Sequence, residues 1–185
     1  MTTPVWITLS LLALLAWAFL VRWFDRNPRA GDLGTGMLYR LLQGYSYLFH
    51  RMRVEGRENI AGVLAAGPGP LIVVANHTAG VDPVLIQCAL HFEVRWMMAR
   101  DMMHPALDPV WEWAGVIAVE RGGRDSGSAR DAIRYVRAGG ALGIFPEGGI
   151  ERPARTLKPF LPGVGFIIAK TGAPVLPIII EGIPE

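Results

Sequence analysis

The sequence is poor in cysteine and in net charge, and both shortages narrow the classes of protein to which it can belong. Cys88 is the only cysteine among 185 residues, which excludes an internal disulfide framework and a zinc site built from several cysteines. A single thiol also agrees with a reducing compartment. The net charge is only +2 and basic residues do not alternate with aromatic ones, so no nucleic-acid partner is expected. An anionic membrane surface or a phosphorylated ligand suits the basic residues better.

Charged side chains are absent from residues 1–21, where the sequence is almost wholly apolar. Apart from Thr8 and Ser10, the stretch from Val5 to Val21 would span about 25 Å as a helix, at the short end for a membrane-spanning segment. A secretory signal peptide would start with basic residues and end at a small-residue cleavage site, which this stretch lacks. A buried soluble helix is rarely apolar on every side. Residues 1–24 are therefore predicted to form an N-terminal membrane anchor.

Tryptophan and arginine residues near the ends of this anchor indicate how it meets the bilayer. Trp6 and Trp23 are amphipathic rings of the kind that gather at membrane interfaces. Arg22, Arg26 and Arg29 follow the apolar run. Because positive charge is retained on the inner side of the membrane, these arginines predict that the downstream domain lies in the cytoplasm.

Residues 25–50 are predicted to be a linker followed by an amphipathic helix. Apolar side chains recur there at helical spacing, at Met37, Leu38, Leu41, Leu42, Tyr45, Leu48 and Phe49. This stripe either packs on the following domain or lies in the membrane interface.

Residues 51–185 alternate short apolar runs with helical patterns, which predicts one α/β domain. Strands are expected at Arg51 to Glu55, Leu71 to Ala75, Val94 to Ala99, Gly115 to Val119, Ala141 to Phe145 and Val175 to Ile180. Helices are expected at Pro83 to His91, Ser126 to Ala138 and Gly163 to Lys170, with a turn or short helix at Asn59 to Leu64. This alternation predicts a single mixed, largely parallel sheet flanked by helices.

A histidine and a carboxylate stand where the second of these strands should end. His77 and Asp82 are five residues apart, too far for one helix face, so a turn containing Gly80 must bring them together. Asp82 followed by Pro83 also reads as the N-cap and first position of a helix. A base oriented by a carboxylate is a catalytic arrangement. The alternative interpretation is a structural histidine beside an aspartate that only caps its helix.

Other polar groups follow the ends of two further strands. Glu120 and Arg121 follow one, and Pro146, Glu147 and Gly148 follow another. Ligands of parallel α/β sheets gather at the carboxyl ends of strands. We therefore expect these groups to share one edge of the sheet with the histidine and the aspartate.

These residues also occur in an order that resembles a known family. The blocks are Asn76-His77 with Asp82, then Gly115 to Arg121, then Phe145-Pro146-Glu147-Gly148, then Ala173-Pro174-Val175-Leu176-Pro177. Together they resemble the four blocks of the glycerolipid acyltransferases, typified by the 1-acyl-glycerol-3-phosphate acyltransferases. A histidine and an aspartate at this spacing are a weak signal alone, but they are specific when joined to Phe-Pro-Glu-Gly.

The resemblance implies a role for each matching residue. His77 would be the general base on an acceptor hydroxyl, and Asp82 would orient it. Arg121 would hold the phosphate or other anionic part of the acceptor, while Pro146, Glu147 and Gly148 would shape the glycerol site. The fourth block, with Pro177, would line the region near the acyl group.

The resemblance also implies the reactants. The acceptor would be a lysophospholipid such as 1-acyl-glycerol-3-phosphate, in phospholipid biosynthesis at a membrane bilayer. The donor would be acyl-CoA or acyl-carrier protein, with no metal and no prosthetic group as cofactor.

The sequence departs from the family pattern at two positions. Ala79 stands where the family commonly has serine, and Gly149-Ile150 replaces a Thr-Arg pair whose arginine helps to bind the acceptor phosphate. The second departure leaves the acceptor head group open, although Arg152 or Arg155 could reach the same space. The chain also ends soon after the fourth block, as expected of a minimal member or of an incomplete sequence.

Two other functions are weighed against acyl transfer. A non-catalytic membrane lipid-binding protein could retain the fold while the altered third block has lost its chemistry. A lipid-cleaving serine hydrolase would need a Gly-x-Ser-x-Gly motif, which the sequence lacks.

Overall fold

The computed structural model describes residues 3–29, 31–60, 62, 69–121, 126–153 and 156–182. The chain divides into two compact units, Met1–Arg53 and Val54–Glu185. Each unit is described by itself.

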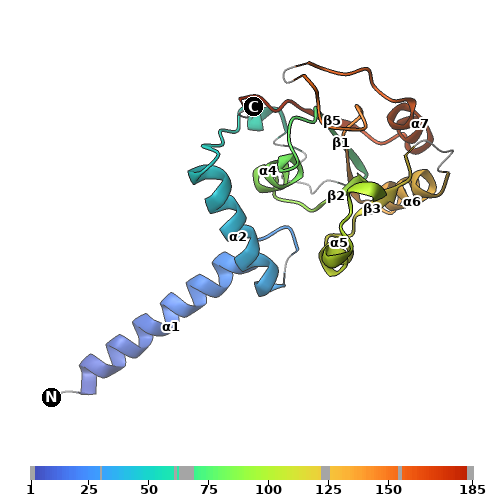
Figure 1. The fold of residues 1–185 in the computed structure, drawn as a ribbon. Coiled ribbons are helices and arrows are strands. Elements are labelled where there is room, and N and C mark those ends of the chain that lie inside the picture. Colours follow the sequence, from blue (N-terminus) through green and yellow to red (C-terminus); the bar gives the residue numbers. More distant parts are fainter. Residues whose placement is uncertain are drawn as a thin grey trace. The chain divides into compact units, whose positions relative to one another are not determined.

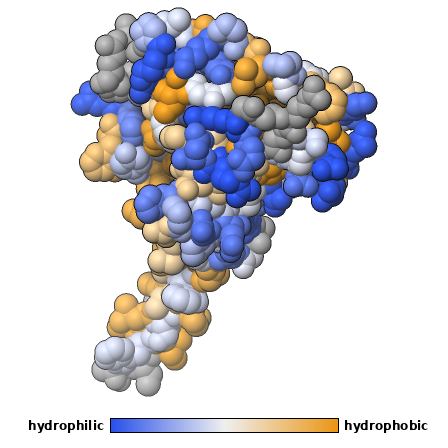
Figure 2. Space-filling model, turned by 45° about the vertical axis from the view of Figure 1, so that its right-hand side comes forward, coloured by the Kyte–Doolittle hydropathy of each residue, from blue (hydrophilic) through white to orange (hydrophobic). Residues whose placement is uncertain are grey.

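The first unit is a pair of helices, α1 (Thr3–Asp25) and α2 (Leu33–Leu48). Within α1, Val5–Asp25 is long and apolar enough to cross a bilayer, and none of its most apolar window is buried. Figure 2 shows the α1 surface, at the lower left, as hydrophobic with pale patches. The expected anchor is therefore a helix whose most apolar stretch is exposed.

Small and polar groups join the two helices. A side chain at Gly36 would place its Cβ only 2.0 Å from the carbonyl oxygen of Phe24, so α2 approaches the end of α1 closely. The Arg40 guanidinium donates to the carbonyl oxygens of Trp23 (2.9 Å) and Arg26 (2.8 Å). Because these contacts use little apolar surface, most of the predicted apolar stripe stays exposed, at Met37, Leu38, Leu41, Tyr45, Leu48 and Phe49.

The helix α2 begins at a capping aspartate. Asp32 accepts a hydrogen bond from the Thr35 backbone N–H (3.1 Å) and another from the Thr35 hydroxyl. These two hydrogen bonds lower the pKa of the Asp32 carboxyl, since they stabilise its charged form. The cap stops the helix from continuing into the preceding linker.

The second unit is built on a five-stranded sheet, whose strands lie in the order β3-β2-β4-β1-β5. Figure 1 shows β5 beside β1 and β2 beside β3. The strands are β1 (Leu71–Ala75), β2 (Val94–Ala99), β3 (Ile117–Val119), β4 (Ala141–Ile144) and β5 (Val175–Ile178). All four pairs of neighbouring strands are parallel. The α/β architecture is thus as predicted, and β1 and β4 are buried as apolar runs of a parallel sheet are.

Helices cover both faces of this sheet. The helices of this unit are α4 (Asp82–Ala89), α5 (Asp108–Ala114), α6 (Ser126–Arg137) and α7 (Pro162–Thr171), with short 3₁₀ turns η1 (Arg57–Ile60), η2 (Arg100–Met102) and η3 (Pro105–Leu107). The faces of the sheet are covered by α4, α6 and α7, while α5 buries none of its residues. On one face, Ile86 of α4 packs with Val73 and Val94. On the other face, α6 and α7 pack with Ile72 and Leu142. The two helices α6 and α7 lie together, apart from α4 (Figure 1).

Several expected boundaries need correction. Residues 51–55 form no strand in the described chain, because none of them pairs with a strand of the sheet. Arg51, at the start of this segment, has a left-handed backbone (φ +48°). The last strand ends at Ile178 rather than Ile180. Residues 61 and 63–64 of the expected turn or helix after Asn59 lie outside the described residues. The helix α5 was not predicted, although it begins with the same Asp-Pro pair as α4.

Candidate active site

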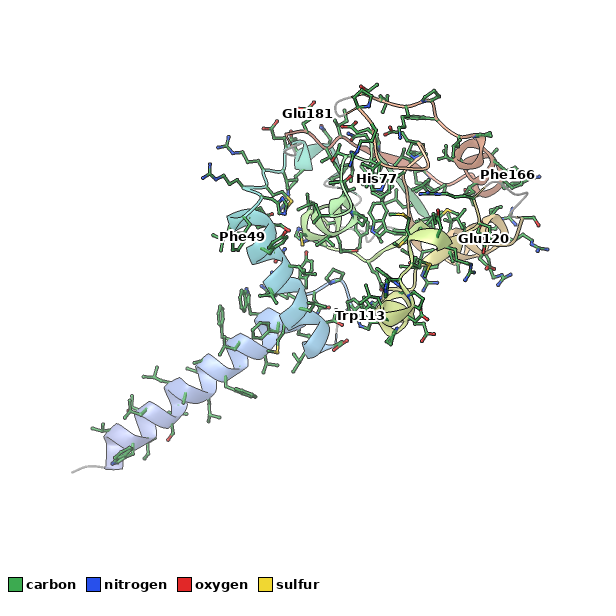
Figure 3. All side chains as sticks on the ribbon, in the orientation of Figure 1. Phe49, His77, Trp113, Glu120, Phe166 and Glu181 are labelled. Carbon is green, nitrogen blue, oxygen red and sulfur yellow. The ribbon has the colours of Figure 1, made fainter. Side chains whose placement is uncertain are left out.

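The strand order brings two of the predicted site segments side by side. His77 follows β1 and Glu147 follows β4, and these two strands are neighbours in register. The carboxyl ends of β1 and β4 therefore lie side by side, at the end of the sheet where ligands of parallel sheets bind. Figure 3 labels His77 at this end of the sheet.

His77 and Asp82 are in direct contact. The imidazole Nδ1 lies 3.0 Å from Asp82 Oδ2, with the His77 side chain 17% exposed and the Asp82 side chain fully buried. A carboxylate accepts only, so the hydrogen sits on Nδ1 when the imidazole is neutral. The other ring nitrogen, Nε2, then carries the lone pair of a base.

The Asp82 carboxylate is held by the loop that precedes it. Oδ2 also accepts from the backbone N–H groups of Thr78 (2.6 Å) and Ala79 (2.8 Å), and Oδ1 accepts from the Thr78 hydroxyl (3.0 Å). The predicted helix cap is corrected here, because α4 begins at Asp82 with Val81 as its N-cap. The carboxylate binds backward, to the turn that carries the histidine. The serine-to-alanine departure at Ala79 leaves this backbone contact in place.

Glu147 fixes the backbone on both sides of the site. Its Oε1 accepts from the His77 N–H (3.1 Å) and its Oε2 from the Lys158 N–H (2.9 Å). Two further bonds tie the same segments together, from the Glu151 N–H to the His77 carbonyl (2.7 Å) and from the Leu161 N–H to the Pro146 carbonyl (2.8 Å). Glu147 is buried, so this carboxylate acts on the loop framework rather than on open solvent.

Gly148 meets two requirements that other residues would not. Its φ is +69°, a left-handed conformation that disfavours side chains. An added Cβ would also lie 2.4 Å from Leu161 Cδ1. The Gly148 N–H donates to the Phe145 carbonyl at 3.1 Å, which closes the tight turn after β4.

A lysine side chain contacts the Gly149-Ile150 segment, where the sequence departs from the family pattern. Lys158 Nζ donates to the Ile150 carbonyl at 2.5 Å, so an ammonium group lies beside the segment where the family arginine is missing. Arg152 is exposed and donates to the Glu151 carbonyl (2.7 Å), while Arg155 lies outside the described residues.

Asn76 and Pro177 connect β1 with the edge strand β5. The Asn76 side-chain amide donates to the Ile180 carbonyl (2.9 Å) and accepts from the Ile180 N–H (2.8 Å), which continues the sheet by one side chain. Pro177 is exposed within β5 and is in register with Val74. An edge strand tolerates its missing N–H.

Arg121 lies at the same edge of the sheet but well away from His77. It follows β3, the outer strand on the side of the sheet opposite to β5. Three strand spacings, about 14 Å, therefore separate β3 from β1. Its guanidinium contacts Asp101 at 3.1 Å, and the neighbouring Glu120 contacts Arg100 at 2.5 Å. All four side chains are exposed. Figure 3 shows Glu120 and His77 apart on the sheet.

Sequence reasoning missed the contacts that two residues make with this framework. Thr78 supplies both its backbone N–H and its hydroxyl to Asp82, and Lys158 reaches Glu147 and Ile150. A hydroxyl four residues before a turn aspartate is a signal that could have identified Thr78. Within the described residues, no three histidine, cysteine, aspartate or glutamate side chains gather as a metal site would need.

Comparison with known proteins places this geometry in a family. The acyltransferase family model matches residues 51–181, which include the whole sheet. The chain belongs to the acyltransferase family. Its blocks after β1, β3 and β4 are the segments whose contacts are described above.

Similar proteins of known activity share this part of the chain. The chloroplastic 1-acyl-sn-glycerol-3-phosphate acyltransferase BAT2 of Brassica napus is 30% identical over 167 residues, covering 86% of this chain and 45% of that protein. The 1-acyl-sn-glycerol-3-phosphate acyltransferase of Borreliella burgdorferi is 30% identical over 128 residues, covering 68% of this chain and 49% of that protein. This chain thus spans about half the length of these relatives.

The fold also matches a solved structure. The crystal structure of the 1-acyl-sn-glycerophosphate (LPA) acyltransferase PlsC from Thermotoga maritima aligns with a TM-score of 0.59 and 23% identity, over 96% of this chain and 74% of that one. At this identity the match establishes the fold.

Proposed function

We propose that this protein transfers a fatty acyl group from an acyl thioester to a hydroxyl of a lysophospholipid, such as 1-acyl-glycerol-3-phosphate. The observation that carries the proposal is the His77–Asp82 pair at the carboxyl end of β1, which leaves Nε2 as a base. The printed activity of the relatives from Brassica napus and Borreliella burgdorferi supports the choice of acceptor. The reaction belongs to phospholipid biosynthesis.

The proposed step uses His77 as a proton carrier. A glycerol hydroxyl is a weak nucleophile, so Nε2 takes its proton while the oxygen forms a bond to the thioester carbon. Collapse of the tetrahedral intermediate breaks the carbon–sulfur bond, and the leaving thiolate takes the proton from Nε2. Asp82 stabilises the imidazolium that exists between these two transfers, as a buried negative partner does. The products are an ester and a free thiol, of CoA or of acyl-carrier protein.

Substrate contacts are proposed for the residues around this pair. Glu147, Pro146 and Gly148 shape the glycerol site by fixing the two loops, and Pro177 lies beside the region for the acyl chain. For the tetrahedral oxyanion, the N–H of Gly80 is the stronger candidate, because the N–H of Gly148 already donates to Phe145.

Two cations are proposed to meet the anionic part of the acceptor. Arg121 offers a planar fork that suits a phosphate, and it is exposed beside Asp101. Lys158 lies nearer to His77 through its backbone contact with Glu147. A short acceptor head group at His77 would meet Lys158, and a longer one would meet Arg121.

We place the enzyme at a membrane, with the domain after α1 on the cytoplasmic side. The apolar surface of α1 and the exposed apolar stripe of α2 support contact with a lipid bilayer. The arginines after the apolar run, Arg22, Arg26 and Arg29, support the orientation.

The test is product analysis on membranes that contain the full chain. Membranes are incubated with lysolipids that differ in head group, each with acyl-CoA or acyl-carrier protein, and products are identified by mass spectrometry. We expect an acylated product and thiol release that depend on the acceptor, and neither with His77→Ala. Lipid binding without any acceptor-dependent product would replace this proposal by the non-catalytic lipid-binding function.

A further inference from the structure

Three aromatic rings from three neighbouring strands are stacked beside the candidate base. The His77 imidazole lies over the Phe145 ring with centroids 4.0 Å apart and planes 14° apart. The other neighbour of Phe145 is Trp96, with centroids 4.8 Å apart and planes again 14° apart. The rings follow or belong to β1, β4 and β2, which are adjacent in the sheet. The stack therefore runs across the sheet from the core to the reacting histidine.

The backbone of β4 makes room for this stack. Gly143 pairs in register with Trp96, and a Cβ on Gly143 would lie 2.4 Å from Trp96 Cε3. Any larger residue at position 143 would therefore push the indole away from its place.

The indole is also placed at a cost in hydrogen bonding. Trp96 Nε1 is buried and makes no hydrogen bond with the described protein. A buried donor without a partner destabilises a fold, so a tryptophan used only to fill space would be better replaced by an apolar ring. The face of the indole, which contacts Phe145, is the part that this position uses.

We propose that Phe145, supported by Trp96, is a positioning platform for His77 that also stabilises its protonated form. This inference rests on the proposed function. The stack fixes the plane of the imidazole while Asp82 fixes Nδ1, so Nε2 is aimed in one direction. When His77 carries the hydroxyl proton, its positive ring lies over the electron-rich face of Phe145, well within the distance of about 6 Å for cation–π attraction.

The variants tested below change Phe145, Trp96 or Phe92, and none of them removes a charged side chain near His77. Asp82, at the start of α4, contacts Nδ1, and Glu147, after β4, accepts from the backbone N–H. Glu151 donates its backbone N–H to the His77 carbonyl. The second ring that stacks on Phe145 is Trp96, so Trp96 can be changed without removing any of these groups.

The experiment compares ring-removing and ring-keeping variants of the full chain in membranes. Phe145→Leu is expected to lower kcat about 2- to 30-fold with little change in KM. Trp96→Leu is expected to lower kcat by a smaller factor, and Trp96→Phe should restore most of that loss. The matched control is Phe92→Leu, which removes an aromatic ring from the same buried cluster outside the stack. It should lower the melting temperature without lowering kcat.

A second readout needs no turnover. NMR of isotope-labelled histidine, with the signal assigned by comparison with His77→Ala, follows the titration of His77 in detergent. Phe145→Leu should shift the titration midpoint to lower pH by about 0.4 to 1.5 units, because the protonated ring loses its π partner. An unshifted midpoint, or equal losses of kcat in Phe145→Leu and Phe92→Leu, would overturn the platform. The NMR result stands even if no acyl transfer is found, so it separates this inference from the proposed function.

Discussion

Two groups of polar residues follow the carboxyl ends of the strands, one after β1 and β4 and the other after β3, and they differ in burial and in bonding. At the β1–β4 end, hydrogen bonds of 3.1 and 3.0 Å join His77 to Glu147 and to Asp82, and the two carboxylates are buried. At the β3 end, Arg121 and Glu120 form exposed ion pairs with partners twenty residues earlier in the chain. Exposed pairs contribute little to stability and rearrange readily.

The difference indicates a division of work between the two ends. Groups that move a proton need fixed positions, because small displacements cost large factors in rate. Groups that hold a mobile, charged ligand can exchange one partner for another without loss of the fold. Changes at the β1–β4 end should therefore alter kcat, and changes at the β3 end should alter KM.

Removal of the base should produce the largest effect. His77→Ala removes the proposed base, so acyl transfer should fall by about 10⁴-fold, the upper range for general base catalysis. The rate of acyl transfer is measured as thiol release from the donor in the presence of the acceptor. Melting temperature and membrane association serve as controls and should stay near the wild-type values. Substantial transfer by a folded His77→Ala protein would remove His77 from the mechanism.

Two substitutions of Asp82 should separate charge from hydrogen bonding. Asp82→Asn retains an oxygen for the donors of Thr78, Ala79 and His77, so it should stay folded while kcat falls by about 10²-fold or more. Asp82→Ala leaves those buried donors without partners, and each costs about 1 to 3 kcal/mol of stability. Measurement of kcat, together with thermal unfolding in detergent, distinguishes the effect of Asp82→Asn from that of Asp82→Ala. Equal kinetics of Asp82→Asn and the wild type would show that the charge is not needed.

The sequence predicted the sheet well because each strand is a local apolar run. Leu71 to Ala75 and Val94 to Ala99 were expected as strands and are observed with the same limits. The failure at Arg51 to Glu55 has a different cause, since its alternating pattern is satisfied by partial burial without any strand partner. The brief helix α5 escaped detection because seven residues are too few to show a helical period.

The candidate site was predictable only where its parts are close in sequence. His77 and Asp82 could be paired from their spacing, and a parallel sheet implied a common edge for Glu147 and Arg121. The order of the strands was not readable, and it is this order that puts Glu147 beside His77 and Arg121 three strands away. The backward orientation of Asp82 and the contacts of Lys158 depend on loop geometry that no periodic pattern encodes.

A subtler change at the β1–β4 end tests the framework rather than the base. Each oxygen of Glu147 accepts one backbone N–H, so Glu147→Gln must turn its amide hydrogens toward one of these donors. We expect a loss of about 1 to 3 kcal/mol in the free energy of unfolding. A reduction in kcat should accompany it as the His77 loop loosens. Thermal unfolding and kinetics on the same sample measure both. Full stability in Glu147→Gln would mean that the two loops are held by other contacts.

The β3 end should give the smallest effect on stability and the most selective effect on kinetics. Arg121→Ala removes an exposed guanidinium, so its free energy of unfolding should change by no more than about 1 kcal/mol. A charge-assisted bond to the acceptor is worth about 1.5 to 3 kcal/mol, so KM should rise about 10- to 150-fold, with kcat retained, for an acceptor whose anionic group lies far from its reacting hydroxyl. Lys158→Met is the matched change at the other end, and its side chain keeps a similar apolar length. If Lys158→Met raises KM and Arg121→Ala does not, the acceptor phosphate binds close to His77, and the β1–β4 end both binds the acceptor and moves the proton.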